Sequence, residues 1–317
     1  MFFRVAQHHL KTLLRVLQCF SRQGEELFVE ATSREGVKLR TLNSSVSAFL
    51  LVALHPPMFF LEFDCPVGCQ FKLFLKPLLQ VFRNITTMSE LQVEFLSPAT
   101  AGQMDSGPVS MTTTSLVCRV QCMSGMYKVF RLHAEECEIL QAVFPMREEV
   151  GHFSQDAKFF HECLSQFHGS DFARFSFSGD SMLLQSTLED GPAQGMSALH
   201  SDHTPVNTSI PVRKSDLRRF RPPKEDTGTP IPEVHFSVAV RECKNFLAFV
   251  ETFQVDINFY FFDGGSPVMF SGEDPEGLFS CNLVLATGSD PVSGSSQASV
   301  DTTVSRGALS SPPARRR

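Results

Sequence analysis

Residues 11–27 read Lys-Thr-Leu-Leu-Arg-Val-Leu-Gln-Cys-Phe-Ser-Arg-Gln-Gly-Glu-Glu-Leu. Apolar residues recur in this stretch every three or four positions, which is the period of an amphipathic helix. The pattern predicts a helix over about residues 8–21, whose buried face carries Leu10, Leu13, Leu14 and Leu17. A second set of side chains lies at spacings of three, four and seven and therefore shares another face: His8, Lys11, Arg15 and Arg22.

The same period predicts three further helices, over about residues 74–86, 156–167 and 241–253. Each has basic residues opposite its apolar face: Lys76 and Arg83 on the second, Lys158 on the third, and Arg241 and Lys244 on the fourth. None of these basic stripes contains an acidic residue, although the chain has a formal net charge of −6. Positive charge concentrated on one kind of surface of an acidic protein is typical of a wall that faces phosphates.

Short segments with a period of two lie between the helices and predict strands. Residues 234–240 and 255–261 alternate between apolar and polar, and residues 119–131 form a hairpin pattern around Ser124-Gly125. Strands outnumber helices, and the sequence therefore predicts an α+β fold with mostly antiparallel sheets. The order helix, strands, helix, strands occurs twice, which indicates two structurally similar halves.

This repeat gives a predicted domain division: an N-terminal domain over residues 1–144, a connector over 145–155, a C-terminal domain over 156–290 and a disordered Ser/Thr-rich tail over 291–317. Residues 97–114 and 189–204 are predicted loops. The length of 317 residues agrees with two domains, each large enough for its own core.

Composition places the chain among ordinary intracellular proteins. It has no run of 18 apolar residues that could span a membrane and no apolar stretch near its start suited to secretion. The nine cysteines are odd in number and lie in apolar stretches, which favours buried, reduced thiols over a disulfide framework. The 31 phenylalanines lie on apolar helix faces and alternate along predicted strands, where they are expected to pack the core.

Several segments resemble the Rad-nine subunit family of the nine-one-one checkpoint clamp. The resemblance begins with residues 11–27 and Leu39-Arg-Thr-Leu-Asn-Ser-Ser-Val-Ser-Ala-Phe49, and it continues with Met58-Phe-Phe and Lys76-Pro-Leu-Leu-Gln-Val-Phe-Arg83. Leu140-Gln-Ala-Val-Phe144, Leu247-Ala-Phe-Val-Glu, Pro267-Val-Met-Phe and Leu283-Val-Leu-Ala-Thr-Gly-Ser-Asp290 follow in the same order. The similarity thus covers roughly residues 4 to 290.

The resemblance implies a fold like proliferating-cell nuclear antigen, in which two similar domains of antiparallel sheet each place two helices on the inside of a ring. It further implies a nuclear DNA-damage checkpoint protein that encircles double-stranded DNA in a heterotrimer with Rad-one and Hus-one type subunits. An ATP-driven clamp loader would open the ring, and checkpoint activators and repair enzymes would bind it. The DNA-facing residues are then Lys11, Arg15, Arg22, Lys76, Arg83, Lys158, Arg241 and Lys244.

The remaining motifs do not predict an enzyme, a cofactor or a metal site. The Cys-x-x-x-Cys pairs lack the spacing of structural zinc sites, and GxxxxGK[ST] and GxSxG are both absent. Although exonuclease activity has been attributed to the family, no set of carboxylates suggests a nuclease site. The acidic phosphoserine motif with which family members bind their activator is not recognisable either.

The densest basic cluster is Arg213, Lys214, Arg218, Arg219, Arg221 and Lys224, which suits a solvated connector, a DNA contact or a nuclear-import signal. Ser296 and Ser311 match minimal phosphorylation patterns. Two other functions stay open: a homotrimeric replication-type clamp, and an interaction scaffold with the clamp fold that no longer encircles DNA.

Overall fold

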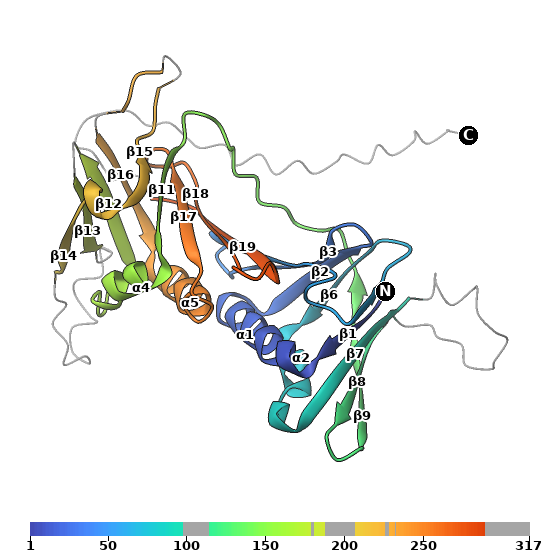
Figure 1. The fold of residues 1–317 in the computed structure, drawn as a ribbon. Helices are drawn as coiled ribbons and strands as arrows, with labels where there is room; N and C mark the ends of the chain where they lie inside the picture. Colours follow the sequence, from blue (N-terminus) through green and yellow to red (C-terminus); the bar gives the residue numbers. More distant parts are fainter. Residues whose placement is uncertain (98–113, 179–180, 188–206, 226–227, 232, 289–317) are drawn as a thin grey trace, which may run out of the picture.

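The computed structural model describes residues 1–97, 114–178, 181–187, 207–225, 228–231 and 233–288 (Figure 1). The predicted loops over 97–114 and 189–204 lie largely outside the described residues, as do the predicted tail and both phosphorylation candidates, Ser296 and Ser311.

The described residues of the N-terminal half form two α-helices and ten strands. In chain order they are β1 (Phe2–Ala6), α1 (Gln7–Gln23), β2 (Glu26–Thr32), β3 (Gly36–Leu42), β4 (Ala48–Leu54), β5 (Glu62–Asp64), β6 (Cys69–Phe74), α2 (Leu75–Val81), the 3-10 turn η1 (Ile85–Thr87), β7 (Met88–Leu96), β8 (Ser115–Cys122), β9 (Tyr127–His133) and β10 (Glu135–Glu136).

The C-terminal half repeats this order of elements. It contains β11 (Gly151–Asp156), α4 (Ala157–Ser165), β12 (Phe172–Ser178), β13 (Ser181–Thr187), β14 (Ser209–Arg213), the 3-10 turn η2 (Lys214–Asp216), β15 (Arg218–Arg221), β16 (Glu233–Ala239), α5 (Val240–Glu251), β17 (Asp256–Phe261), β18 (Val268–Glu273) and β19 (Phe279–Leu285). The predicted repeat of helix and strands is therefore present.

The described strands form three sheets. Neighbouring strands within each sheet are antiparallel, as the sequence predicted. Their orders are β5-β1-β7-β8-β9, β14-β13-β12-β16 and the ten-stranded β10-β6-β2-β3-β4-β19-β18-β17-β11-β15. The ten-stranded sheet contains strands of both halves, and β4 pairs β19 from Ala48↔Leu285 to Leu54↔Phe279 at the junction. Six of the seven residues of β4 are buried, as expected of a strand in the middle of a wide sheet that is covered on both faces.

Phenylalanine packing accounts for much of the C-terminal core, which confirms the role predicted for these residues. Phe177 stacks on Phe261 with a ring-centroid distance of 4.2 Å, and Phe175 stacks on Phe236 at 5.4 Å. Phe153 contacts the same cluster and is fully buried. Because β11 carries Phe153, residues 151–155 of the predicted connector are part of the sheet. The segment without regular structure is residues 137–150, and the predicted division into domains otherwise stays a prediction.

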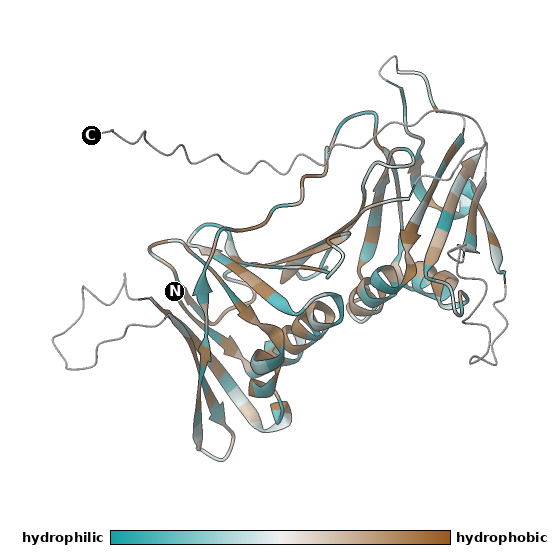
Figure 2. Cartoon of the chain, turned by 180° about the vertical axis from the view of Figure 1, so that it is seen from behind, coloured by the Kyte–Doolittle hydropathy of each residue, from teal (hydrophilic) through white to brown (hydrophobic). Residues whose placement is uncertain are grey.

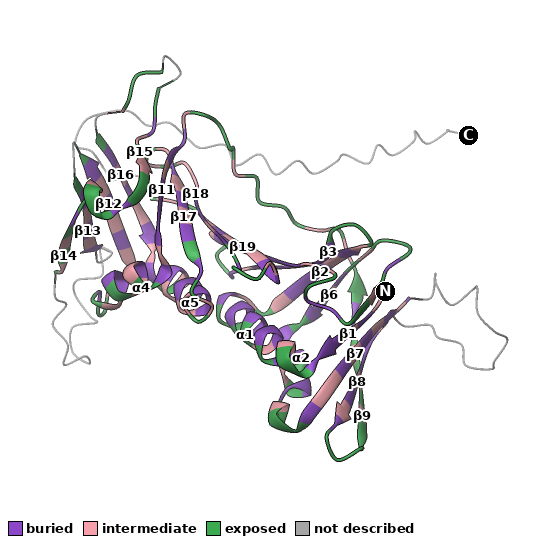
Figure 3. Cartoon of the chain, viewed as in Figure 1, coloured by how far each residue is buried: buried purple, intermediate pink, exposed green. Residues whose placement is uncertain are grey.

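The four α-helices of the described residues lie in one row, in the order α4, α5, α1, α2, on one side of the ten-stranded sheet (Figure 1). The connecting segment 137–150 crosses the opposite side of that sheet. Helix residues alternate between apolar and polar (Figure 2), and the buried ones face the sheets (Figure 3). At the centre of the row, the Gln23 Nε2 of α1 donates to the Glu242 backbone oxygen of α5 at 2.9 Å.

Three helices match their predicted ranges closely, but α2 is shorter than predicted. Its backbone leaves the helical region at Phe82 (φ −91°, ψ 5°) and Asn84 (φ −119°, ψ 49°). Asn84 and the β-branched residues after it have low helix propensity. Arg83 therefore lies in a turn after the helix, where its backbone N–H donates to the Gln80 carbonyl.

Candidate nucleic-acid interface

The exposed side of the helix row carries most of the basic residues predicted to face DNA. Their positions follow from the apolar faces: α1 buries Leu10, Leu13 and Leu17 against the sheets, which leaves the opposite side to solvent. The exposed basic side chains are Lys11, Arg15, Arg22, Lys76, Arg83, Lys158 and Arg241. A single row thus brings together residues from both halves of the chain.

Arg15 is positioned by a contact that crosses between the two halves. The carbon of its guanidinium lies 5.6 Å from the ring centroid of Phe253, which follows α5. An arginine over an aromatic face is held by the quadrupole of the ring while its N–H groups stay available to another acceptor. The Arg15 side chain is therefore oriented at the centre of the row and still presents its charge to solvent.

Lys244 differs from the other predicted DNA-facing residues. Its ammonium donates to the Phe167 carbonyl at 2.9 Å, beyond the end of α4. Burial lowers the pKa of Lys244, because the charged form is less well solvated there. This side chain ties α5 to α4 and directs its charge into their contact.

Acidic residues on α4 and α5 offset much of the positive charge of those two helices. Lys158 pairs with Glu162 at 3.8 Å on α4, and His161 Nδ1 lies 2.5 Å from Glu251 Oε2 of α5. Helix α5 also carries Glu242 beside Arg241. In contrast, α1 and α2 contain no acidic residue. The net positive charge of the row is therefore concentrated on α1, α2 and the turn after α2.

The second predicted basic cluster lies away from the helix row, on β14, η2 and β15. Arg218 forms an ion pair with Asp256, with Nη1 2.8 and 2.7 Å from the two carboxylate oxygens. Arg221 donates to the Val150 carbonyl at 3.1 Å, and the Lys214 ammonium lies 4.5 Å from the centroid of the Phe220 ring. Arg213, Arg219 and Lys224 are exposed.

Two sheet edges lie at opposite ends of the molecule (Figure 1). Strand β9 ends the five-stranded sheet, and β14 ends the four-stranded sheet. The hairpin of β9 carries exposed apolar side chains: Met123, Met126, Tyr127 and Val129. An exposed strand with apolar side chains tends to pair with another chain. The only indication in the sequence is that these residues flank a hairpin turn, where polar residues are usual.

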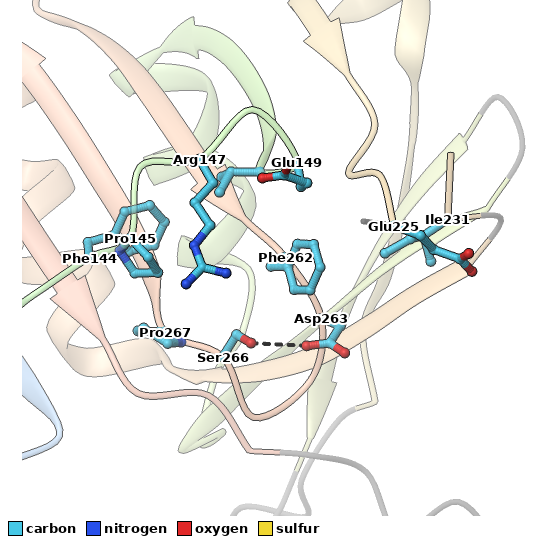
Figure 4. A pocket seen from close by; sticks show the side chains of 11 residues that line it. Phe144, Pro145, Arg147, Glu149, Glu225, Ile231, Phe262, Asp263, Ser266 and Pro267 are labelled. Atoms are coloured by element: carbon cyan, nitrogen blue, oxygen red, sulfur yellow. Dashed lines mark hydrogen bonds between the residues drawn. The ribbon is translucent and has the colours of Figure 1, made fainter. Parts of the chain in front are cut away.

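A cavity of about 660 Å³ lies beneath the connecting segment (Figure 4). The Arg147 side chain extends into it between Pro145 and Phe262 and points toward Ser266, whose hydroxyl lies 3.0 Å from a carboxylate oxygen of Asp263. The lining combines apolar rings with four charged side chains, Arg147, Glu149, Glu225 and Asp263, so that an apolar group and a charged group of a peptide could both be bound there.

Among the described residues, no three His, Cys, Asp or Glu side chains converge in a way that could hold a metal ion. No helix in that part of the chain has the length and apolar content needed to cross a membrane. All nine cysteines are free, as predicted, and burial raises the pKa of the Cys118 thiol to about 12.

Solved structures with the same architecture are sliding clamps. A PCNA2–PCNA3 complex from Sulfolobus tokodaii matches with a TM-score of 0.61 and 12% identity, covering 90% of this chain and 99% of that one. Proliferating cellular nuclear antigen from Entamoeba histolytica matches with a TM-score of 0.61 and 11% identity, covering 91% and 98% respectively. The chain therefore has the sliding-clamp fold, as predicted.

A comparison with protein-family models identifies the family more specifically than the fold does. The family model described as Rad9 matches residues 13–288, which is most of the chain. This protein belongs to the Rad9 family, and the resemblance found in its sequence is confirmed.

Proposed function

We propose that this chain is one subunit of a DNA-damage checkpoint clamp that encircles duplex DNA in the nucleus. The observation that carries the proposal is the helix row, whose exposed side bears seven basic side chains in a protein with a net charge of −6. Membership of the Rad9 family and the sliding-clamp fold support it. The function needs no catalytic residue, because the ring would hold DNA topologically.

The chemistry of the row suits sliding. Lysine and arginine contacts to phosphates read no bases, and they exchange with counterions as the protein moves. A wall of such contacts attracts DNA without fixing its register. Charge concentrated on α1 and α2 supplies this attraction, while the paired residues of α4 and α5 contribute less.

Ring closure would use β9 and β14. These two end strands differ in length and in side chains, and they lie at opposite ends of the molecule. Contacts of this head-to-tail kind close a ring when the rotation between subunits allows it. We assign the neighbours to Rad-one and Hus-one type subunits, on the strength of the family. An ATP-driven loader would open the ring, since the chain has no nucleotide-binding motif of its own.

Recruitment of checkpoint activators and repair enzymes is assigned to the connecting segment 137–150 and the cavity beneath it. Leu140, Val143 and Met146 are exposed along this segment. An apolar peptide side chain could occupy the cavity, with Arg147 available for a polar contact.

The test is retention of the assembled ring on closed circular DNA, compared with the same DNA after linearisation. The chain is co-expressed with Rad-one and Hus-one type subunits and loaded with the clamp loader and ATP. A ring that encircles DNA stays on the circle at high salt and slides off the linear form. Equal loss from both forms would contradict encirclement and favour the scaffold function. A stable trimer of this chain alone would favour the homotrimeric clamp.

A further inference from the structure

Strand β15 is an edge strand that contains a bulge. It is the last strand of the ten-stranded sheet and pairs only with β11 among the described strands. His152 pairs with Arg221 and Ser154 pairs with Arg218, so Arg219 and Phe220 together oppose the single residue Phe153. Arg219 has a φ of +53°, in the left-handed region that glycine favours. Bulges of this kind re-aim side chains and are frequent at sheet edges.

The bulge changes which side chains the strand exposes. Arg218, Arg219 and Arg221 are all exposed, whereas Phe220 between them is half-buried and stacks toward Phe177 at 6.2 Å. The Lys214 ammonium lies over the Phe220 ring, 4.5 Å from its centroid. These four residues, Lys214, Arg218, Arg219 and Arg221, are called the basic ridge below.

Among the described residues, a carboxylate neutralises the charge of only one member of the ridge. Arg218 is paired with Asp256. Arg221 donates to a backbone carbonyl and Lys214 lies over an aromatic ring. Neither partner carries a negative charge that would neutralise the cation. Arg219 makes no ion pair or side-chain hydrogen bond within the part of the chain that the structure describes. A left-handed conformation costs a residue other than glycine about 1 kcal/mol or more, and here it orients a free arginine outward.

We propose that the basic ridge docks an extended acidic segment of a partner protein, which adds to β15 as a further strand. The outer edge of β15 offers backbone N–H and C=O groups to such a segment, and the ridge offers charges for its carboxylates. This surface lies away from the helix row (Figure 1), and the proposal does not depend on ring formation.

Charge and size favour an acidic peptide over duplex DNA. Four residues of strand span only about 13 Å, and Asp216, Asp256 and Glu225 border the ridge. A continuous row of phosphates would meet these carboxylates, whereas a short peptide can place its acidic residues between them. The chain's own end is an unsuitable occupant, because residues 291–317 contain one acidic residue, Asp301, and four arginines.

The test is binding of a labelled peptide of about 12 alternating Glu and Val residues to the full chain, followed by fluorescence anisotropy. Matched peptides replace Glu by Lys or by Ser, and a fourth probe is a short DNA duplex. The protein variant Lys214→Ser/Arg219→Gly removes two charges and relieves the strained φ, so that folding is preserved. Arg34→Ser, which changes an exposed arginine on the β2–β3 turn outside both the basic ridge and the helix row, is the control.

The expected result is that the Glu peptide binds, that the double variant weakens its binding by about tenfold or more, and that Arg34→Ser has no effect. A Glu peptide with alternate backbone N-methyl groups should lose its binding, because it cannot pair with the strand. Equal binding of the Ser peptide, or of the double variant, would overturn the proposal. Duplex DNA that binds through the ridge more tightly than the Glu peptide would also overturn it and assign the surface to nucleic acid.

Discussion

Arg4 connects three strands at one edge of the five-stranded sheet through its guanidinium. Its Nε and Nη2 atoms lie 2.8 Å from the two carboxylate oxygens of Glu90 on β7, and its Nη1 atom lies 3.3 Å from Glu62 on β5. The hydrogen bond from Arg4 lowers the pKa of Glu90 from its ordinary value of 4.5, against the opposing effect of burial. This pairing links the stability of the N-terminal half to pH.

We expect Glu90→Gln to destabilise the protein at neutral pH and to change its response to acid. A carboxyl group whose pKa is lowered on folding stabilises the protein above its ordinary pKa, and this stability is lost as the pH falls through the lowered value. The difference in unfolding free energy between wild type and Glu90→Gln should thus be constant near pH 7 and shrink below pH 4.5. Urea unfolding across a pH series measures it.

Glu62→Gln is the matched control, since Glu62 binds the same arginine from a more exposed position. Its effect should be smaller at every pH, because solvent screens exposed ion pairs. If Glu90→Gln and wild type lose stability in parallel down to pH 3, the Arg4–Glu90 pair does not contribute as described.

Gly24 ends α1 at a point where the chain has no room for a side chain. Its backbone N–H donates to the Phe20 carbonyl at 2.9 Å, and a Cβ atom there would lie 2.3 Å from both the Leu42 carbonyl oxygen and the Thr41 hydroxyl. We expect Gly24→Ala to destabilise the protein by about 2 kcal/mol or more, because a backbone atom cannot move aside as a flexible side chain can.

Gly68→Ala serves as the control for Gly24→Ala, because its Cβ would meet nothing nearer than 3.5 Å. It should change the unfolding free energy by less than about 0.5 kcal/mol. Denaturant unfolding of the two variants measures the comparison, and equal stability of both would contradict the close packing at the end of α1.

At the scale of elements, the helices of the row show which features the sequence predicts and which it does not. Helix α1 was predicted to within two residues at each end, because its apolar face repeats without interruption. Helix α2 was not, because Phe82 and Ile85 continue the apolar period although the backbone has left the helix. An apolar period predicts which residues are buried, but it does not show whether the backbone at those residues is a helix or a turn.

In the candidate site too, the sequence predicted some features correctly and missed others. Periodicity placed Lys11 and Arg15 on an exposed face, and the structure exposes both. It also placed Lys244 there, but that ammonium contacts the Phe167 carbonyl of a different element. Contacts between elements distant in sequence also produce the pairing of His161 with Glu251 and the end strands β9 and β14. Local sequence carries none of this information.

The uneven charge of the helix row gives a prediction about DNA retention by the ring. Lys11→Gln/Lys76→Gln and Lys158→Gln/Arg241→Gln each remove two positive charges. We expect the first pair to reduce the slope of log retention against log salt concentration by about 1.8, at roughly 0.9 per phosphate contact. The second pair should have less effect, because Glu162 lies 3.8 Å from Lys158 and α5 carries two acidic residues of its own, Glu242 and Glu251.

Retention on linear DNA with open ends, from which a ring can slide off, is measured across a salt series to compare the two helix variants. Both should fold and assemble as wild type does, since all four side chains are exposed. Equal effects of the two variants would show that α4 and α5 contact phosphates as fully as α1 and α2. No effect of either would show that the row does not face DNA.

At the scale of the whole molecule, β4 and β19 join the two halves into one body, and the edge strands β9 and β14 lie at its far ends. Seven residue pairs join β4 to β19, and Leu50, Val52, Leu54, Phe279 and Leu283 are all buried there. A rigid subunit of this kind fixes the angle between β9 at one end and β14 at the other. That angle decides whether head-to-tail contacts close into a ring or continue as a filament.

Assembly should therefore depend on the apolar side chains of β9. Tyr127 and Val129 are 66% and 56% exposed, and contact with a neighbouring subunit would remove that apolar surface from water. We expect Tyr127→Glu/Val129→Glu to leave the isolated chain folded, because neither side chain is buried, and to abolish co-elution with the subunit that binds this end. Binding at the β14 end should persist, so that a two-subunit complex replaces the ring. Val46→Glu changes a side chain that is 73% exposed on the β3–β4 turn and should leave the ring intact. Size-exclusion chromatography with mass measurement distinguishes these species, and an intact ring with the β9 variant would exclude this strand from the interface.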